Sequence, residues 1–211
     1  MDRESQIDTF CRYSQVSRET ITSLMKYEEF LINRNKTLNL VGNSTISNIW
    51  YRHFLDSAQV IDFIDKSQKT LVDIGSGAGF PGLVLSIVAK DKKIPVKIKL
   101  IEKSKKKIIF LKEIITKLNL NAIAINENIE DEKFHFIDDT FVARAFKPLP
   151  KIFELIHNKA KNFKKIIIFL GKNGKDALLQ ASKNWDIKYK QRMSVTSEDS
   201  LIIEVNKLIK K

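Results

Sequence analysis

The stretch Leu71-Val72-Asp73-Ile74-Gly75-Ser76-Gly77-Ala78-Gly79-Phe80-Pro81-Gly82 decides the fold of this chain. It begins with apolar, β-prone residues around one acid and continues with four glycines within eight positions. Glycine permits a positive φ and lets a ligand approach the backbone without meeting a Cβ atom. Proline is tolerated here because the first turn of a helix has no amide hydrogen bond to lose. The pattern predicts a buried strand, a glycine turn that cradles a cofactor, and a helix.

Two classes of cofactor fit this turn. Gly77, Gly79 and Gly82 match the G-x-G-x-x-G dinucleotide fingerprint, and Glu102 follows 20 residues later, where an acid binds ribose hydroxyls. The same features fit S-adenosylmethionine, which carries an adenosine but no phosphate. Asp73 favours this methyl donor, because a carboxylate at the strand end would repel a pyrophosphate and suit an ammonium and a sulfonium. A nicotinamide-dependent oxidoreductase remains the alternative.

The composition indicates a globular protein with an anionic partner. The chain has 211 residues, a net charge of +12 and 43% hydrophobic residues, which suits one α/β domain with an extension. The positive charge favours a nucleic acid as partner, although a lysine-rich composition without a specific partner explains it equally well.

Cysteine usage and apolar runs exclude several other classes. Cys11 is the only cysteine, so neither an internal disulfide nor a multi-cysteine metal site is expected. No apolar leader begins the chain, and the longest apolar run, 166–170, is too short to span a bilayer. These features predict a cytoplasmic protein that binds no metal and no membrane.

Hydrophobic periodicity divides the chain into two parts that pack as one globular unit. Residues 1–66 are expected to form a helical extension, with a second helix from about Thr45 to Ile64. Residues 67–211 alternate short apolar strands with helical patterns, which is typical of a parallel sheet. Strands are predicted near 70–74, 96–101, 121–125, 139–143, 165–170, 186–192 and 200–206. Helices are predicted over 104–119, 149–159 and 173–183, with a loop over 126–138. The pattern fits a Rossmann-like class I methyltransferase sheet, in which the last strand inserts antiparallel.

The end of the fourth strand supplies two candidate site residues. Arg144 and Lys147 follow it, and ligands of open parallel sheets bind beyond the carboxyl ends of the strands. Arg144 could hold the donor's carboxylate or a substrate phosphate, or form an ion pair with an acid such as Asp73.

Further candidates follow the other strands. Ile129 and Glu130 come after the third strand, beside the expected adenine, and Phe80 could pack on the donor or belong to the core. Lys106 and Lys107 oppose the dipole of their helix, which suits either an RNA phosphate or a solvated charge run. Lys172 follows the fifth strand and is another candidate phosphate contact.

Cations and aromatic residues alternate in the extension. Arg52 and Asp56 are one helical turn apart, so periodicity favours a simple pair between them. Alternatively Arg52 and His53 face the crevice and bind RNA or donor, with Trp50 or Tyr51 stacking on a base.

Missing motifs narrow the reaction. The sequence Ala143-Arg144-Ala145-Phe146 is unlike the Asn/Asp-Pro-Pro-aromatic loop that methylates exocyclic amines. Methylation of a pyrimidine at C5 needs a cysteine nucleophile, and Cys11 lies far from every motif of the chain. Guanine N7 makes neither demand, since its lone pair is nucleophilic and carries no proton. Catalysis then reduces to positioning and electrostatics, with no general base.

Five segments resemble the bacterial small-subunit ribosomal RNA methyltransferase G family, also called glucose-inhibited division protein B. They are Leu38-Asn39-Leu40, Arg52-His53-Phe54-Leu55-Asp56-Ser57, the glycine loop from Asp73 to Gly82, Lys106-Lys107 with Phe110-Leu111, and Ala143-Arg144-Ala145-Phe146. The resemblance covers the chain from about residue 38 to the end. Alanine replaces the family's serine at position 143, and Lys107 stands where arginine is usual.

The resemblance implies methyl transfer from S-adenosylmethionine to N7 of one guanine in the decoding region of 16S ribosomal RNA. It implies donor contacts from Gly75, Phe80, Ile129, Glu130 and Arg144, and it favours a functional role for Arg52 and His53. The expected partner is 16S ribosomal RNA or a small-subunit assembly intermediate, and the protein is expected to be a monomer. A non-catalytic RNA-binding protein with a vestigial cofactor fold is the second alternative.

Overall fold

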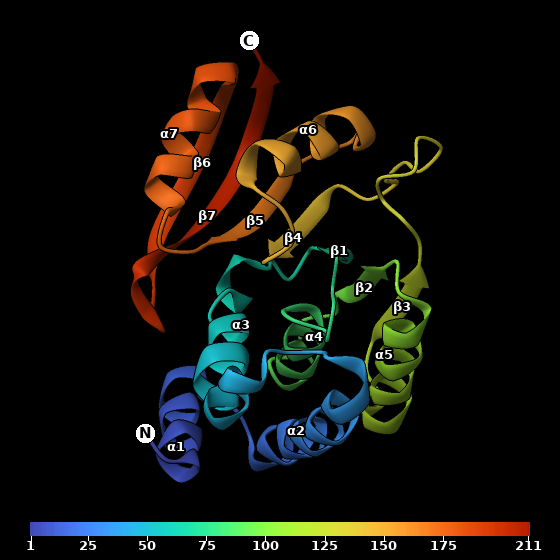
Figure 1. The fold of residues 1–211 in the computed structure, drawn as a ribbon, viewed down its shortest axis with the longest axis vertical. Coiled ribbons are helices and arrows are strands. Elements are labelled where there is room, and N and C mark those ends of the chain that lie inside the picture. Colours follow the sequence, from blue (N-terminus) through green and yellow to red (C-terminus); the bar gives the residue numbers. More distant parts are fainter.

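Successive apolar side chains of the central strands point to opposite faces, so these strands contribute to a core on each face of one sheet. The computed structural model describes residues 1–211 and contains a seven-stranded sheet in the order β3-β2-β1-β4-β5-β7-β6 (Figure 1). Its strands are β1 (Thr70–Ile74), β2 (Lys97–Glu102), β3 (Ala122–Asn126), β4 (Thr140–Arg144), β5 (Lys165–Leu170), β6 (Trp185–Ser194) and β7 (Ser197–Lys210). β7 is antiparallel to both neighbours, and the other pairs are parallel. All seven predicted strands and the antiparallel insertion of the last one are confirmed.

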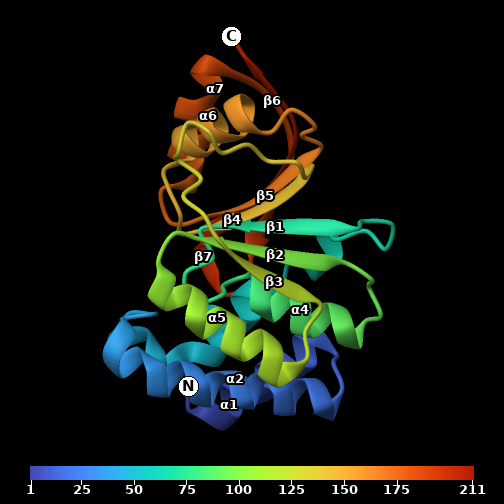
Figure 2. The same ribbon diagram turned by 90° about the vertical axis from the view of Figure 1, so that its right-hand side faces the viewer.

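Helices cover both faces of the sheet (Figure 2). One layer holds α4 (Gly82–Asp91) and α5 (Lys105–Leu118), covered in turn by α2 (Arg18–Leu38), and α1 (Arg3–Ser14) lies outside it. The other layer holds α6 (Leu149–Lys159) and α7 (Gly174–Asn184). The predicted helices over 104–119, 149–159 and 173–183 are confirmed, and the chain between β3 and β4 forms only turns, as expected.

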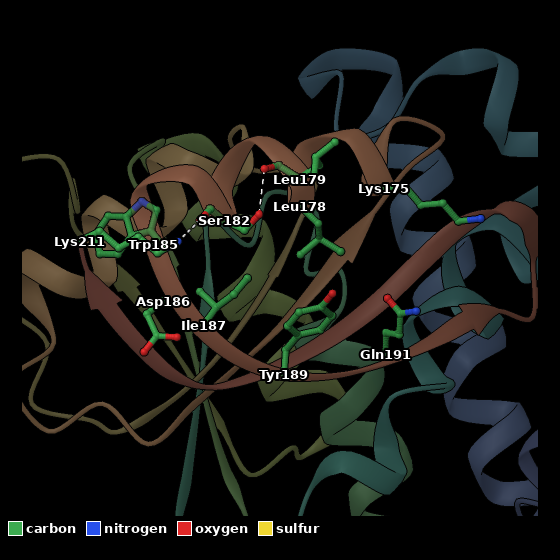
Figure 3. Close-up of a pocket in the computed structure, with 10 residues that line it drawn as sticks. All are labelled: Lys175, Leu178, Leu179, Ser182, Trp185, Asp186, Ile187, Tyr189, Gln191 and Lys211. Atoms are coloured by element: carbon green, nitrogen blue, oxygen red, sulfur yellow. Dashed lines mark hydrogen bonds between the residues drawn. The ribbon is translucent and has the colours of Figure 1, made fainter.

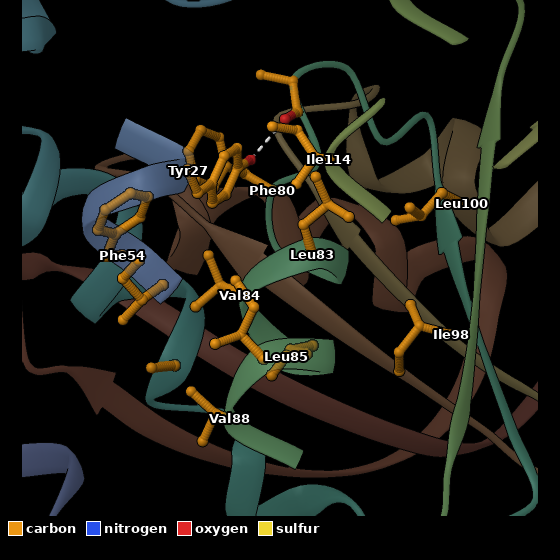
Figure 4. Close-up of a cluster of buried hydrophobic side chains, with 14 of the residues drawn as sticks. Tyr27, Phe54, Phe80, Leu83, Val84, Leu85, Val88, Ile98, Leu100 and Ile114 are labelled. Atoms are coloured by element: carbon orange, nitrogen blue, oxygen red, sulfur yellow. Dashed lines mark hydrogen bonds between the residues drawn. The ribbon is translucent and has the colours of Figure 1, made fainter. Parts of the chain in front are cut away.

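The extension shares its core with the sheet. Tyr27 and Phe54 of the extension are fully buried against Phe80 of the glycine loop (Figure 4). Leu83 and Val84 of α4 belong to the same cluster. Burying these side chains stabilises the fold by about 1.5–3 kcal/mol each, so the extension is held firmly against the glycine loop.

The prediction of one regular helix from Thr45 to Ile64 is wrong, because the segment is helical but divided into four short helices of different types. The segment consists of η1 (Asn43–Asn48, 3-10), η2 (Trp50–Leu55, a π-helix), α3 (Asp56–Ala58) and η3 (Ile61–Phe63, 3-10). Tertiary hydrogen bonds explain the interruption. The Ser47 carbonyl accepts from Gln6 at 2.9 Å and the Arg52 carbonyl accepts from Arg144 at 2.6 Å, so both are engaged outside the segment.

Candidate functional site

Close packing explains the glycines that join β1 to α4. A Cβ atom at Gly79 would lie 2.4 Å from Leu83 Cδ1, and one at Gly82 would lie 2.6 Å from Asp73 Oδ2. Gly79 also has a φ of +97°, a conformation that side chains disfavour. The loop is therefore fixed tightly between the sheet, α4 and the extension.

The outer side of the loop is open at Gly77. A Cβ atom there would meet only the Gly75 carbonyl oxygen, at 3.9 Å, whereas one at Gly75 would lie 2.3 Å from the ring of Phe146. Phe146 follows β4, so its ring borders the loop from the next strand. The loop thus presents backbone to a ligand at Gly77, as a donor cradle requires.

Asp73 is a fully buried acid at the base of this loop. Its Oδ2 accepts from the Gly82 amide at 2.9 Å, while its buried Oδ1 has no hydrogen-bond partner. Burial raises the pKa of Asp73 from 3.8 to about 7, against the lowering effect of the Gly82 and Ser76 hydrogen bonds. An unpartnered buried carboxylate oxygen suits a cationic ligand group such as the ammonium of S-adenosylmethionine, so the residues present fit this donor.

Glu102 ends β2 beside the same loop. Its Oε2 accepts from the Gly77 amide at 3.0 Å, and its Oε1 accepts from the Ser104 amide at 2.8 Å. The carboxylate thus ties the loop to the start of α5. Each oxygen retains a second lone pair, so the predicted contacts with ribose hydroxyls are compatible with these bonds.

Arg144 is held by the extension. Its Nε lies 2.7 Å from Asp56 Oδ2, its Nη2 donates to the Arg52 carbonyl and its Nη1 lies 3.3 Å from His53 Nδ1. Arg144 therefore does pair with an acid, as the sequence allowed, but the acid is Asp56 and not Asp73. The predicted pair between Arg52 and Asp56 is wrong. The π-helix accounts for this error, because its wider turn removes the alignment of residues four apart.

His53 is a neutral base within this cluster. Its ring stacks on Phe80 at a centroid distance of 4.8 Å. Burial, reinforced by the charges of Arg144 and Arg52, lowers the pKa of His53 to about 3. A guanidinium can only donate, so Nδ1 accepts from Arg144 and Nε2–H donates to Thr45 Oγ1 at 2.9 Å.

The aromatic residues of the extension differ in their access to a ligand. Trp50 is fully buried and packs edge-to-face on Phe10 at 5.5 Å, so the suggestion that it stacks on a base is wrong. Tyr51 is half-buried, and its hydroxyl donates to the Val195 carbonyl at 3.2 Å. Phe80 is 7% exposed and belongs to the core, with one side against His53.

The segment after β3 supplies one buried and one exposed candidate. Ile129 packs into the core beneath α6, with 4% of its surface exposed. Glu130 is exposed and accepts from Lys147 Nζ at 2.7 Å, which lowers the pKa of Glu130. Lys147 therefore joins the candidate adenine segment to the end of β4.

The remaining cations predicted to bind RNA lie at the surface. Lys106 and Lys172 are exposed and Lys107 is half-buried, and none of the three forms an ion pair. They stand at the first turn of α5 and after β5, close to the carboxyl edge of the sheet. Their positions are compatible with phosphate contacts.

A polar cluster around Asp56 was not predicted from the sequence. Asp56 Oδ1 accepts from Thr196 Oγ1 at 2.7 Å, from Gln59 Nε2 at 2.8 Å and from Ser194 Oγ at 3.3 Å. Gln59 is fully buried and also accepts from the Val195 amide at 3.0 Å. Only the occurrence of Asp56 in the Arg-His-x-Leu-Asp-Ser segment indicated that this acid has a specific role.

Two hollows lie near the last two strands. One, of about 630 Å³, opens beside Arg144 between the extension, the ends of β4 and β5, and the turn from β6 to β7. The other, of about 440 Å³, lies between α7 and β6 and is lined by Leu178, Trp185 and Tyr189 (Figure 3). Only the first includes residues of the candidate site.

No group of three or more His, Cys, Asp or Glu side chains could hold a metal ion, and no helix is long and apolar enough to cross a membrane.

Comparison with known proteins points to one family. The model of the family described as rRNA small subunit methyltransferase G matches residues 20–203. A ribosomal RNA small subunit methyltransferase G of Pelagibacter ubique (strain HTCC1062) is 40% identical over 199 residues, covering 93% of this chain and 92% of the relative. One of Rickettsia akari (strain Hartford) is 39% identical over 196 residues, covering 93% of this chain and 98% of the relative.

Solved structures share the fold at low sequence identity. A SAM dependent methyltransferase from Aquifex aeolicus superimposes with a TM-score of 0.53 at 15% identity, covering 73% of this chain and 90% of that chain. M. capricolum TrmK in complex with S-adenosyl-homocysteine gives a TM-score of 0.51 at 20% identity, covering 72% and 67%. These likenesses establish a Rossmann-like class I methyltransferase fold.

Proposed function

Because the chain belongs to the rRNA small subunit methyltransferase G family, we propose that it methylates N7 of one guanine in the decoding region of 16S ribosomal RNA. The enzyme is an S-adenosylmethionine-dependent methyltransferase that acts on ribosomal RNA. The observation that carries the assignment to this site is the buried Asp73 carboxylate, whose free oxygen lies at the base of the loop that leaves Gly77 open.

Residues of the sheet edge would hold the methyl donor. We assign the backbone of Gly75, Gly77 and Gly79 to its cradle, and Asp73 to its ammonium. Further donor contacts are assigned to Phe80, Glu102, Ile129, Glu130 and Arg144. When bound, S-adenosylmethionine supplies a methyl group activated by its sulfonium.

The chain's own residues need only position the reactants for N7. This nitrogen attacks with a lone pair that carries no proton, so no side chain has to accept one. His53 is neutral and already hydrogen-bonded on both ring nitrogens, which fits a positioning role better than proton transfer. Arg144 and Lys147 are the positioning candidates, since both stand at the end of β4.

The RNA would reach the site across cationic residues. We assign phosphate or base contacts to Arg52, Lys106, Lys107, Lys147 and Lys172, whereas the neutral His53, also a candidate RNA contact from the sequence, keeps only the positioning role. The target guanine has to leave its stack to approach the methyl group. We further propose a cytoplasmic monomer, in keeping with a substrate that belongs to the ribosome.

Calorimetric titration of the purified protein with S-adenosylhomocysteine and with NADH tests the cofactor. We expect micromolar binding of the first and none of the second, and the reverse result would support an oxidoreductase. Incubation with labelled S-adenosylmethionine and small-subunit ribosomal RNA, followed by mapping of N7-methylguanine, tests the reaction. RNA binding that is salt-sensitive, independent of donor and without methyl transfer would instead support a non-catalytic RNA-binding protein.

A further inference from the structure

The hollow beside Arg144 is built by three segments that are distant in the sequence. Tyr51, Arg52 and Asp56 line it from the extension, Phe169 and Gly171 line it from the end of β5, and the turn from β6 to β7 closes the third side. Hydrogen bonds join two of these walls, the extension and the turn, because Tyr51 donates to the Val195 carbonyl and Gln59 accepts from the Val195 amide. The hollow is therefore a defined part of the fold.

Its position relative to the donor loop suits an acceptor. Arg144 lines the hollow and also lies over the ring of Phe80, with its guanidinium carbon 5.9 Å from the ring centroid. Phe80 lies within the glycine loop, between Gly79 and Gly82. Arg144 and His53, whose ring lies 4.8 Å from that of Phe80, thus stand between the hollow and the glycine loop. Both the hollow and the loop lie at the carboxyl ends of the strands.

The lining has the chemistry that binds a nucleotide. Phe169 and Tyr51 are half-buried aromatic side chains on two different walls, and aromatic faces stack on bases that have left a helix. The hydroxyls of Ser197 and Ser200 can bond the edge of a base, and Arg52 is an exposed cation without an ion pair at the rim.

We propose that this hollow is the acceptor subsite, which holds the flipped guanine nucleotide between Phe169 and Tyr51 while Arg52 contacts its phosphate. The proposal rests on the proposed function and assigns the substrate side of the same centre. Arg144 forms the boundary between base and donor.

Gly171 offers a selective test, because it lines the hollow and a Cβ atom there would have no other atom within 4 Å. Its backbone does not adopt the left-handed conformation that side chains disfavour. Gly171→Phe should therefore fold normally and fill the subsite, whereas Gly171→Ala should leave most of it free. We expect Gly171→Phe to lower kcat/KM for small-subunit ribosomal RNA by about a hundredfold, and the smaller Gly171→Ala side chain to lower it less.

Ser67→Phe is the matched control. Ser67 is exposed and lines a different hollow, of about 1070 Å³, at the amino ends of the strands. The substitution adds an aromatic ring away from the site, so its kcat/KM should equal that of the wild type.

Thermal melting and S-adenosylhomocysteine titration of all variants show whether the fold and the donor site are intact. Normal donor affinity with unchanged kcat/KM in Gly171→Phe would overturn the proposal. If Gly171→Phe fails to fold, Gly171→Val replaces it in the same assay. A lowered kcat/KM of Gly171→Val then supports the subsite, and an unchanged kcat/KM overturns the proposal.

A binding experiment separates this proposal from the proposed function. Failure of the wild type to methylate ribosomal RNA would refute the proposed function, yet guanosine monophosphate can still be titrated in the presence of S-adenosylhomocysteine and followed by NMR. Binding that Gly171→Phe abolishes and Ser67→Phe preserves supports the subsite, and binding that Gly171→Phe leaves unchanged overturns it. Arg52→Ala should also reduce the slope of log K against log salt for RNA binding by about 0.7, as loss of one phosphate contact requires.

Discussion

Replacing Asp56 by alanine should weaken both the fold and the site. Its carboxylate accepts from Arg144 Nε at 2.7 Å and from Thr196 and Gln59 at 2.7 and 2.8 Å. The Asp56 and Arg144 side chains are only 14% and 17% exposed, so the variant leaves a cation and two polar groups in a poorly solvated place. Removing one partner of a buried ion pair costs about 3–5 kcal/mol, and residual solvent access puts this case near 3 kcal/mol.

Urea unfolding and thermal melting measure this loss directly. For a chain of this size, about 3 kcal/mol corresponds to a fall in Tm of about 6–12 °C. A double-mutant cycle with Arg144→Ala should give a coupling free energy of about 2 kcal/mol, because the second substitution removes the charge that the first left unpaired.

Asp138→Ala provides the control for this prediction. Asp138 precedes β4, and its carboxylate lies 2.8 Å from Lys99 Nζ of β2. The burial is similar, because the side chains of Asp138 and Lys99 are 10% and 19% exposed. Both variants should lose stability, but only Asp56→Ala should weaken S-adenosylhomocysteine binding, since it alone releases Arg144. A loss of stability below about 0.5 kcal/mol for Asp56→Ala, or strictly additive effects in the cycle, would refute the reasoning.

Three further substitutions test the donor loop. Burial raises the pKa of Asp73 from 3.8 to about 7, so its stabilising contribution is complete below pH 3.8 and disappears as the pH rises through 7. The unfolding free energy of the wild type relative to Asp73→Asn should therefore fall between pH 3.8 and 7. A constant difference between the two proteins in urea titrations over this range would contradict the prediction. Tyr27→Phe leaves the buried Ala78 carbonyl without its donor at 2.6 Å and should cost about 1–3 kcal/mol in the same assay, an effect absent if water replaces the hydroxyl. Gly79→Ala meets Leu83 at 2.4 Å in a left-handed conformation and should lower the unfolding free energy by more than about 1 kcal/mol; unchanged thermal melting would show that the loop relaxes.

Local patterns predicted the sheet and the donor loop because both are encoded by neighbouring residues. Alternation along a strand fixes which side chains face each helical layer, and Leu71 and Val72 indeed enter opposite cores. The glycines of the loop occupy positions where a Cβ atom would clash with neighbouring side chains or where φ is positive. Because these glycines lie close together in the sequence, their spacing predicted the turn. Ser104 caps α5 through a bond that also spans only three residues.

Partners distant in the sequence could not be predicted in this way. Asp56 and Arg144 are joined only because the extension packs over the end of β4, and no spacing rule relates residues from two such elements. The π-helix added a second difficulty. A regular helix would align Arg52 with Asp56, but the wider turn frees the acid for Arg144 and sends Trp50 into the core.

The two sides of the site are therefore encoded differently. In the proposed assignment, the donor side needs one continuous stretch, the glycine loop, and the acid at the end of β2. The proposed acceptor side needs the extension, the end of β5 and the turn from β6 to β7, brought together around Asp56 and Gln59. Because Arg144 makes its side-chain hydrogen bonds to the extension and lies 5.9 Å from the ring of Phe80, the extension would determine how donor and acceptor meet. If the proposed acceptor subsite is right, specificity for one ribosomal nucleotide would arise from the parts of the chain that lie outside the glycine loop.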